Sequence, residues 1–478
     1  MPALARPSPR FDDVPRSVGL PTEAQRSWGS ILLDYDRDGL ADLFLNHHER
    51  RPFLGHNEDG RFTNVWGGTL QKRWMDRHGC AWGEANGDGR PDLYCTQGAS
   101  RGLGTGPNQL LLQTSTGLVN RAFRYGVRDA FGRGRTINWM DFDSDGDLDM
   151  FVGNTYREGH PNLTFKNVGR RFSRVNIGLS RELRTISSSW SDWDNDGDPD
   201  LLVLQYGTHP AVAFANRGGR FSPVRLPLVS GRPWISGAWG DFNADGRTDL
   251  QVVNERHSLI LRNTGRTFRA VHRTRLNQGQ TSEWIDVDND GDLDSFVVQG
   301  ASSSPKGPRN HSDFLLINKG RHFAKRAIAS ARGPHGGSGD AISAGDFDRD
   351  GRVDLHVTNG HGPEGWTGPG QLLRNVSPGG TWIGVHLEGS DSNPLGMGAR
   401  LVVRAGSRRL KREVTDGFHH RTQSEVGYVH FGLGNHERAR VRIEWPDGKS
   451  DCTVVNAGSI AQVARGSSPC RQGRPHSP

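Results

Sequence analysis

The chain has 478 residues, and 33% of them are hydrophobic, but the apolar residues occur only in short runs. No run approaches the roughly 18 apolar residues that a membrane-spanning helix requires, so the sequence predicts no such span. The formal net charge is +7, from 60 Lys and Arg against 53 Asp and Glu. Glycine accounts for 64 residues. So many glycines between short runs of Val, Ile, Leu and Phe favour an all-β fold with many turns.

A nine-residue pattern, Asp-x-Asp-x-Asp-Gly-x-x-Asp, occurs seven times with small variations, and successive copies begin 45 to 60 residues apart. This spacing is typical of a propeller blade and not of a helical repeat. We call the seven copies loops one to seven. The ligand positions are Asp34, Asp36, Asp38 and Asp42; Glu84, Asn86, Asp88 and Asp92; Asp141, Asp143, Asp145 and Asp149; Asp192, Asp194, Asp196 and Asp200; Asp241, Asn243, Asp245 and Asp249; Asp286, Asp288, Asp290 and Asp294; and Asp346, Asp348, Asp350 and Asp354.

The sequence around each loop predicts four strands. An apolar run precedes the loop and a β-rich run follows it, and a third run ends in Asn-x-Gly before a Phe, as at Asn167 and Asn318. Asn-x-Gly is typical of a turn, and the Phe is predicted to begin the fourth strand. We therefore expect a seven-bladed β-propeller over residues 11–378. The segment Phe11–Val14 resembles a fourth strand without a repeat before it, so we expect it to complete the last blade and remove the exposed sheet edges.

The loops are predicted to bind calcium. Oxygen atoms at positions one, three, five and nine, with the carbonyl at position seven, provide the hard ligands that Ca²⁺ requires. The glycine at position six permits the sharp turn. Seven regularly spaced copies favour this interpretation over plain acidic turns, because unneutralised carboxylates repel one another at close range. We expect up to seven Ca²⁺ ions. Loop two, with Glu84 and Asn86, is equally compatible with a vacant site.

The charge outside the loops predicts anionic partners. Ligand positions account for 26 of the 53 acidic residues, which leaves 27 elsewhere against 60 Lys and Arg. A basic surface favours sulfated or uronic glycans, phosphates or acidic lipid headgroups, although it is equally compatible with a merely soluble protein. Nucleic acid is less favoured, because the sequence contains no recognised nucleic-acid-binding module.

Turns alternate between the two rims of a blade, so the loops between second and third strands are expected on the rim opposite the calcium loops. Six of these seven loops contain histidine, and ligands of propellers are expected where such loops converge. The predicted ligand-binding residues are His160, Arg184, His209 and Trp234. The alternative function is an enzyme, such as a lyase, isomerase or cyclase acting on a small molecule in the central channel. Its acid–base candidates would be Asp76, His78, Glu283, His335 and Asp340.

Four cysteines leave two possibilities open: disulfides between Cys80 and Cys95 and between Cys452 and Cys470, or four reduced thiols. The first residues contain no apolar segment typical of a signal peptide, so a cytoplasmic location stays possible. We expect residues 1–10 and 466–478 to be flexible tails. In the region 379–465, alternating strands at Ala399–Val403 and Arg440–Trp445 predict a small β-sandwich or barrel.

The repeats resemble FG-GAP/VCBS repeats, as in integrin α-subunit propellers. The C-terminal region resembles an ASPIC/UnbV domain through Trp382-Ile-Gly-Val, Ser392-Asn-Pro-Leu-Gly-Met-Gly-Ala-Arg400, Arg412-Glu-Val414, Phe431-Gly-Leu-Gly434 and Trp445-Pro-Asp-Gly448. Together they resemble the cartilage acidic protein family over nearly the whole chain. This resemblance implies a secreted, calcium-binding protein. The chain departs from the family in its basic charge and in Gly417–Gln423, where the family normally has Tyr and Ser.

Overall fold

The structure is a computed structural model that describes residues 8–24, 26–47, 50–66, 76–98, 106–155, 160–169, 171–302, 309–328, 338–360, 367–419 and 422–470. Within these residues the chain is almost entirely β, apart from the short helix α1 (Ala122–Tyr125). The all-β propeller class expected from the sequence is confirmed. No helix among the described residues is long and apolar enough to cross a membrane.

Seven antiparallel sheets of the described residues follow one plan, with consecutive strands side by side. Their strands are β2 (Ser27–Leu33), β3 (Asp42–His47), β4 (Phe53–Glu58) and β5 (Arg61–Asn64); β6 (Arg77–Gly83), β7 (Asp92–Gln97), β8 (Gln109–Thr114) and β9 (Gly117–Asn120); β10 (Gly134–Met140), β11 (Asp149–Asn154), β12 (Leu163–Asn167) and β13 (Phe172–Val175); β14 (Thr185–Ser191), β15 (Asp200–Gln205), β16 (Val212–Asn216) and β17 (Phe221–Val224); β18 (Ser236–Gly240), β19 (Asp249–Val253), β20 (His257–Asn263) and β21 (Phe268–Arg275); β22 (Gly279–Ile285), β23 (Asp294–Gln299), β26 (Phe314–Asn318) and β27 (Phe323–Ala327); and β28 (Ile342–Gly345), β29 (Asp354–Val357), β30 (Gln371–Asn375) and β1 (Phe11–Asp13). A small hairpin, β24 (Ala301–Ser302) and β25 (Arg309–Asn310), lies outside this plan.

The sheets form a closed ring. The first strands β2, β6, β10, β14, β18, β22 and β28 contact one another in this order, and β28 contacts β2. The N-terminal strand β1 pairs with β30, with Phe11 opposite Asn375, so the N-terminal segment completes the last sheet as the sequence predicts. The core between neighbouring sheets is apolar, and it includes Trp82 and Trp139 from the runs that precede the loops.

Buried asparagines near the end of the third strand connect neighbouring sheets in five of the seven sheets. Their side-chain Nδ2 atoms donate to the carbonyl of the second loop residue in the preceding sheet at 2.7–3.0 Å. We call these residues the asparagine staples; they are Asn57, Asn216, Asn263, Asn318 and Asn375. The sequence pattern predicted only a turn at these positions, because a bond to another sheet depends on the closed ring. The second repeat has Gln113 instead, whose Oε1 is buried without a hydrogen-bond partner in the described structure.

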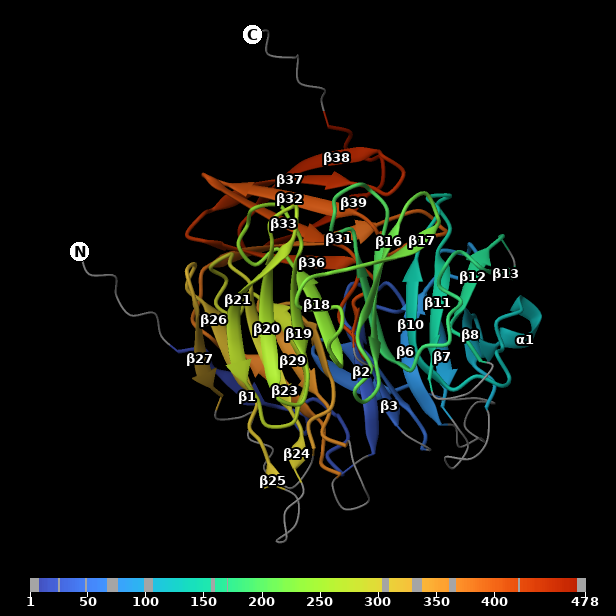
Figure 1. The fold of residues 1–478 in the computed structure, drawn as a ribbon. Helices are drawn as coiled ribbons and strands as arrows, with labels where there is room; N and C mark the ends of the chain where they lie inside the picture. Colours follow the sequence, from blue (N-terminus) through green and yellow to red (C-terminus); the bar gives the residue numbers. More distant parts are fainter. Residues whose placement is uncertain are drawn as a thin grey trace.

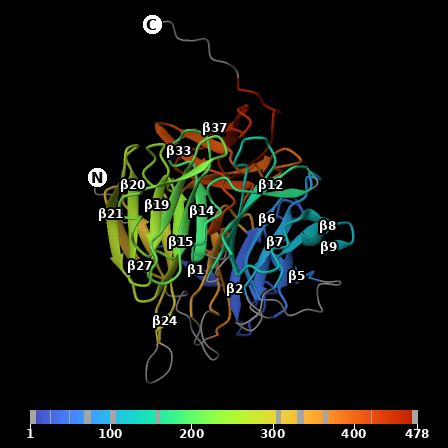
Figure 2. The ribbon, with the colours of Figure 1, turned by 45° about the vertical axis from the view of Figure 1, so that its right-hand side comes forward.

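The C-terminal region forms two sheets that pack face to face, which confirms the small β-sandwich. One sheet has the order β36 (Tyr428–Gly434), β31 (Thr381–Glu388) and β39 (Ser459–Ala464), and the other has the order β33 (Arg408–Glu413), β32 (Arg400–Ala405), β37 (Arg438–Glu444) and β38 (Ser450–Asn456). Their shared core includes Val385, Leu401 and Ile443. In Figures 1 and 2 these strands, in orange and red, lie as a layer across one end of the propeller.

A segment of this domain enters the ring. Strands β34 (Phe418–His419) and β35 (Thr422–Gln423) extend the first sheet, with Gln423 opposite Ile31 of β2. The Gln423 amide accepts a hydrogen bond from the Trp82 backbone N–H at 2.8 Å and donates to the Trp82 carbonyl at 3.0 Å. Asp416 accepts from the Trp139 backbone N–H at 3.0 Å. The described part of residues 413–425, here called the plug, therefore satisfies backbone groups of several first strands at once. The sequence marked this stretch as unusual but did not predict its position.

The staples generate a stability prediction. The substitution Asn216→Ala removes the bond to the Phe142 carbonyl and leaves the Gly219 backbone N–H without its 3.0 Å acceptor. Because both groups are buried, we expect the free energy of unfolding to fall by roughly 2–4 kcal/mol. Denaturant unfolding of both proteins measures this change. Gln113→Ala is the matched control, and we expect it to cost less than about 1 kcal/mol because its side chain makes no staple. Equal losses would contradict a role for the staples.

Candidate metal centres

The loops share one backbone geometry. Position six is glycine in every loop, with φ between 76° and 108°, and position four is also left-handed in every loop. In the first loop Asp34 Oδ1 and Oδ2 accept the backbone N–H groups of Asp38 and Gly39 at 3.0 and 2.9 Å. Loops three, four, five and six repeat this pair of bonds. The glycine at position six therefore forms the sharp turn, as the sequence predicts.

The loops bring their carboxylates together. In four loops, three aspartates each place an oxygen atom within 4.8 Å of the other two: Asp34, Asp36 and Asp38; Asp141, Asp143 and Asp149; Asp192, Asp194 and Asp200; and Asp286, Asp288 and Asp290. The position-nine aspartates lie at the base of each loop, buried, and their Oδ1 atoms accept the backbone N–H of the residue that ends the third strand.

Burial opposes the charged form of these groups. It raises the pKa of Asp42 and Asp149 to about 9, and that of Asp200 and Asp249 to about 8, despite their backbone hydrogen bonds. Neighbouring carboxylates raise the pKa further. A divalent cation would offset both the cost of burying these carboxylates and the repulsion between them, because it supplies the missing positive charge.

The donor set fits calcium. All predicted side-chain ligands are oxygen donors, and hard oxygen atoms are the ligands that Ca²⁺ prefers. Loop carboxylate oxygens that are buried without a hydrogen-bond partner in the described structure include Asp143 Oδ1, Asp200 Oδ2, Asp346 Oδ1 and Asp348 Oδ1. Buried polar atoms are nearly always paired, so such oxygens point to an additional partner. These residues would hold the ion together with the position-seven carbonyl.

Loop two differs in its first ligand. The longer Glu84 side chain bends into the loop, where Oε1 accepts the backbone N–H groups of Asn86 and Gly87, each at 2.8 Å, and of Asp88 at 3.3 Å. Burial raises the pKa of Glu84 to about 7. The glutamate satisfies more loop donors than an aspartate does in the other loops, which favours the weaker or vacant site that the sequence left open.

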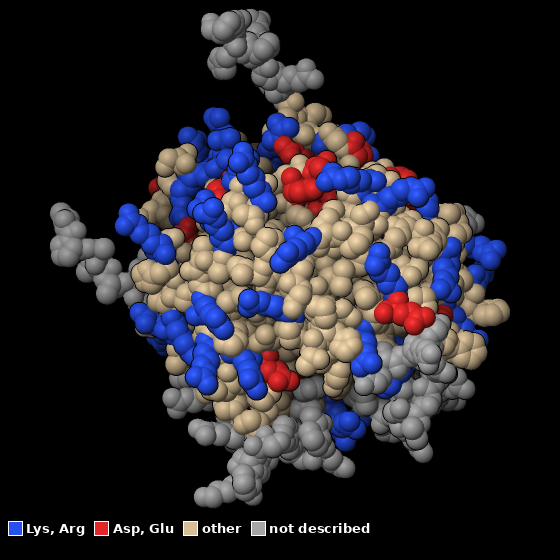
Figure 3. All heavy atoms as spheres, viewed as in Figure 1, with Lys and Arg blue, Asp and Glu red and all other residues tan. Residues whose placement is uncertain are grey.

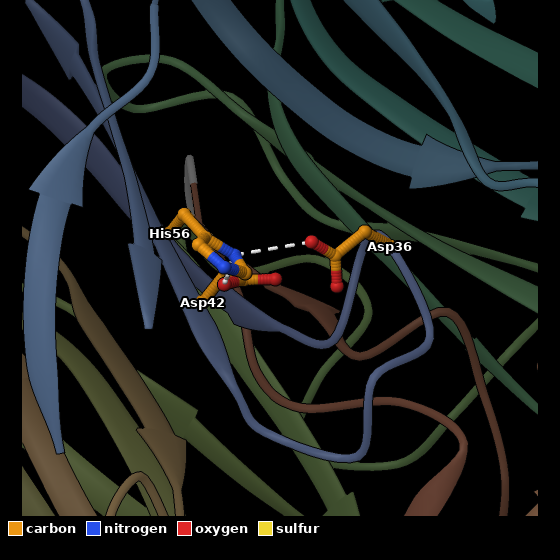
Figure 4. Close-up of side chains that lie close together, drawn as sticks. All are labelled: Asp36, Asp42 and His56. Atoms are coloured by element: carbon orange, nitrogen blue, oxygen red, sulfur yellow. Dashed lines mark ion pairs between the residues drawn. The ribbon is translucent and has the colours of Figure 1, made fainter. Parts of the chain in front are cut away.

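Basic side chains of the third strand reach some loops. His56 Nδ1 lies 3.0 Å from Asp36 Oδ2 and 3.3 Å from Asp42 Oδ1, between two predicted ligands (Figure 4). Lys166 lies 3.0 Å from Asp145, and Arg262 lies 2.9 Å from Asp245. The equivalent residues beside loops four and six are Ala215 and Ile317. Sequence reasoning missed these neighbours, although each stands directly before the third-strand asparagine.

The C-terminal domain covers the calcium-loop rim. Lys411 Nζ donates to Asn195 Oδ1 of loop four at 2.7 Å and to the Gly246 carbonyl of loop five at 3.1 Å. Arg400 pairs with Asp192, and Arg408 pairs with Asp292. Further contacts reach loops one, two, six and seven. A cavity of about 220 Å³ lies in this interface, lined among others by Asp286, Asp346 and Glu425.

The residues predicted for the opposite rim lie in different environments. His160 and His209 are partly exposed and Arg184 is exposed, and the His160 ring lies 6.5 Å from that of the exposed Phe131. Trp234 is only 2% exposed and belongs to an apolar cluster with Ile186. Trp234 is therefore a core residue and not a rim residue, and the sequence of a loop does not reveal which of its side chains are buried.

The candidates for channel chemistry do not form one described cluster. His78 Nε2 lies 2.9 Å from Asp76 Oδ1 at the start of β6. Glu283 lies deeper, where its Oε2 accepts the Ser424 hydroxyl at 2.5 Å and pairs with His419, both from the plug. Burial raises the pKa of Glu283 to about 7 and lowers that of His419 to about 4. Asp340 is buried beside β28, and His335 lies outside the described residues.

Family profiles identify both parts of the chain. The FG-GAP-like repeat profile matches residues 34–95, 85–152, 192–252, 241–297 and 286–357. The chain belongs to the FG-GAP-like repeat family. The ASPIC and UnbV profile matches residues 389–467, which confirms the second domain resemblance.

Two curated relatives match part of the chain. Cartilage acidic protein 1 of Xenopus tropicalis is 28% identical over 191 residues, which cover 37% of this chain and 27% of the relative. The Homo sapiens protein of that name is 30% identical over 177 residues, which cover 34% and 26%. The chain therefore matches about a quarter of the length of each relative.

Three solved structures are similar in shape at low identity. A lectin of Agrocybe aegerita, described as recognising non-reducing terminal N-acetylglucosamine, has a TM-score of 0.44 at 13% identity, with 78% of this chain and 95% of that chain covered. The BP39L lectin of Burkholderia pseudomallei has a TM-score of 0.38 at 12% identity, with 80% and 97% covered. The Dos1 propeller has a TM-score of 0.41 at 8% identity, with 76% and 94% covered.

The unpaired loop oxygens predict that one substitution changes the melting temperature in opposite directions without and with calcium. Asp348 Oδ1 is buried without a hydrogen-bond partner, and burial and Asp350 raise the pKa of Asp348. Without calcium, Asp348→Asn removes a poorly solvated charge, so the melting temperature should rise. With saturating calcium the same substitution removes a ligand, so the melting temperature should fall. Calorimetry of the decalcified and calcium-loaded proteins measures both changes. Asp12→Asn, outside the loops, is the control, and a change of one sign in both conditions for Asp348→Asn would contradict the metal site.

Proposed function

We propose that this chain is a calcium-stabilised β-propeller that binds an anionic or glycan-type ligand on the rim opposite its calcium loops. The observation that supports calcium most strongly is the burial of unpaired loop carboxylate oxygens in a repeated geometry. Seven such loops around one ring would make the folded state depend on bound ions, because a ligand that binds only the native protein stabilises it.

The position of the C-terminal domain supports the choice of rim. Contacts with that domain occupy the calcium-loop side, so we place the ligand at the other rim. There, His160 and His209 offer imidazole nitrogens for hydrogen bonds, and Arg184 offers a guanidinium group that suits an oxyanion. The exposed rings of Phe131 and Tyr206 provide apolar faces on which a sugar ring could pack.

The cysteines support an oxidising, extracellular location. The structure pairs Cys80 with Cys95 across β6 and β7, and Cys452 with Cys470. All four cysteines of the chain are therefore in disulfides, which form and persist mainly outside the reducing cytosol.

Calcium removal tests the first part of the proposal. At a hundredfold excess over the dissociation constant, each site contributes ~2.7 kcal/mol of stabilisation, and several sites act together. We expect excess chelator to lower the melting temperature by more than ten degrees, roughly the effect of several kcal/mol. Restoring calcium, but not magnesium, should reverse the loss. An unchanged melting curve in chelator would overturn the calcium assignment.

A rim variant tests the second part. We expect the combined substitutions His160→Ala, Arg184→Gln and His209→Ala to reduce binding to a panel of neutral, uronic and sulfated glycans at least tenfold, a loss of about 1.4 kcal/mol. The melting temperature and calcium content should not change. The control carries His322→Ala and Arg326→Gln on the outer part of the sixth sheet. Full binding by the rim variant would place the ligand elsewhere.

A further inference from the structure

The outer face of the four-stranded sheet in the C-terminal domain carries three cross-strand rows of side chains. One row, at the end nearest the propeller, contains Glu413, Arg400 and Glu444, in which opposite charges alternate across adjacent strands. The row at the far end contains Arg409, Arg404 and Arg440, which lie directly opposite one another on β33, β32 and β37. We call these three residues the arginine row.

The arginine row is unfavourable for the fold on its own. Adjacent strands lie about 4.8 Å apart, so the three arginine side chains begin at neighbouring positions on the sheet. Like charges placed directly opposite one another destabilise a sheet, whereas the alternating row beside them follows the favourable pattern. The two rows belong to the same strands. The difference between them therefore indicates that the arginine row has a purpose other than pairing the strands.

The surroundings of the row leave its charge uncompensated. Arg404, Arg409 and Arg440 are exposed, and none forms an ion pair with a described carboxylate. Arg442, in the middle row, adds a fourth guanidinium, which lies 3.0 Å from Glu444. A shallow groove of about 730 Å³ follows these residues, and its lining also includes Val402, Thr453 and Val454. Figure 3 shows Lys and Arg side chains gathering at the upper left, over the part of the domain where Figure 1 places these strands.

We propose that the arginine row and its groove bind a linear sulfated polysaccharide. Guanidinium groups donate two parallel hydrogen bonds to an oxyanion such as a sulfate, and a row of them suits regularly spaced sulfates along a chain. No aromatic side chain lines the groove among the described residues, so it lacks the stacking platform of a single-stranded nucleic-acid site. The described residues of its lining also include no Trp, Phe or Leu, the side chains that typically insert into a membrane surface, and the exposed apolar residue Val454 is smaller than these. The disulfide at Cys452, on the groove, suits a polysaccharide of the extracellular space.

This surface is separate from the rim of the proposed function. It belongs to the C-terminal domain, on the calcium-loop side of the propeller, and it requires no occupant of the opposite rim. Arg409 marks its boundary with the propeller, because its guanidinium lies beside Gly246 of loop five.

Binding of sulfated dextran to the full chain in calcium tests the proposal. We expect the triple variant Arg404→Gln, Arg409→Gln and Arg440→Gln to bind at least tenfold more weakly than the native protein, with a flatter dependence of affinity on salt because fewer counterions are released. The melting temperature of the variant without polysaccharide should be unchanged or higher, since like-charge repulsion is removed. That readout separates a binding role from a structural one.

A second triple variant controls for net charge. Arg171→Gln, Arg225→Gln and Arg326→Gln remove the same charge from scattered, exposed positions of the propeller, and this protein should keep its affinity. The rim variant described above should also keep it, which separates this site from the proposed function. Equal losses in both arginine variants, equal binding of unsulfated dextran, or tighter binding to phosphatidylserine vesicles or duplex DNA than to sulfated dextran would each overturn the proposal.

Discussion

The structure depends on how it accommodates carboxylates that are buried at the base of seven loops. The position-nine aspartate is the clearest case: Asp42 and Asp149 are almost fully buried, and the pKa of each is raised to about 9. Its Oδ1 is fixed by the backbone N–H of the third strand, and the same third-strand residue forms the staple to the preceding sheet. In most blades a single third-strand residue therefore contacts both the buried loop carboxylate and the preceding sheet. A change in the metal occupancy of one loop would be transmitted directly to the neighbouring sheet.

The same constraint explains the charge distribution of the C-terminal domain. Arg400, Arg408 and Lys411 all point at loop residues of the propeller, and the net charge of the loops supplies the complementary sign. The basic side chains His56, Lys166 and Arg262 approach loops from within the propeller itself. Loop four has Ala215 at the equivalent position, but Arg217 lies 3.0 Å from Asp196 and Arg400 pairs with Asp192. A cation bound in these loops would therefore compete with protein side chains for the same carboxylates.

The sequence predicted the features that repeat and missed those that join distant segments. The loops, their glycines, the four-strand plan and the closure by Phe11 all follow from local patterns that recur at one spacing. The plug could not be predicted, because its bonds connect residues such as Gln423 and Trp82 that are 341 positions apart. Trp234 was assigned to a surface because its loop lies near the rim, yet the aromatic ring turns into the core. Patterns along a chain indicate which residues form strands and turns, but not which loop side chains are covered by other parts of the protein.

The closure of the ring by β1 also has a consequence for biosynthesis. Phe11 leaves the ribosome before its partner Asn375, which follows more than 360 residues later. At ~5–20 residues per second, the first strand waits on the order of tens of seconds without its sheet. An unpaired strand edge during this interval is a template for association with other chains. The strand is only three residues long, and two of them are Asp12 and Asp13, whose charges make it a poor template until β30 arrives.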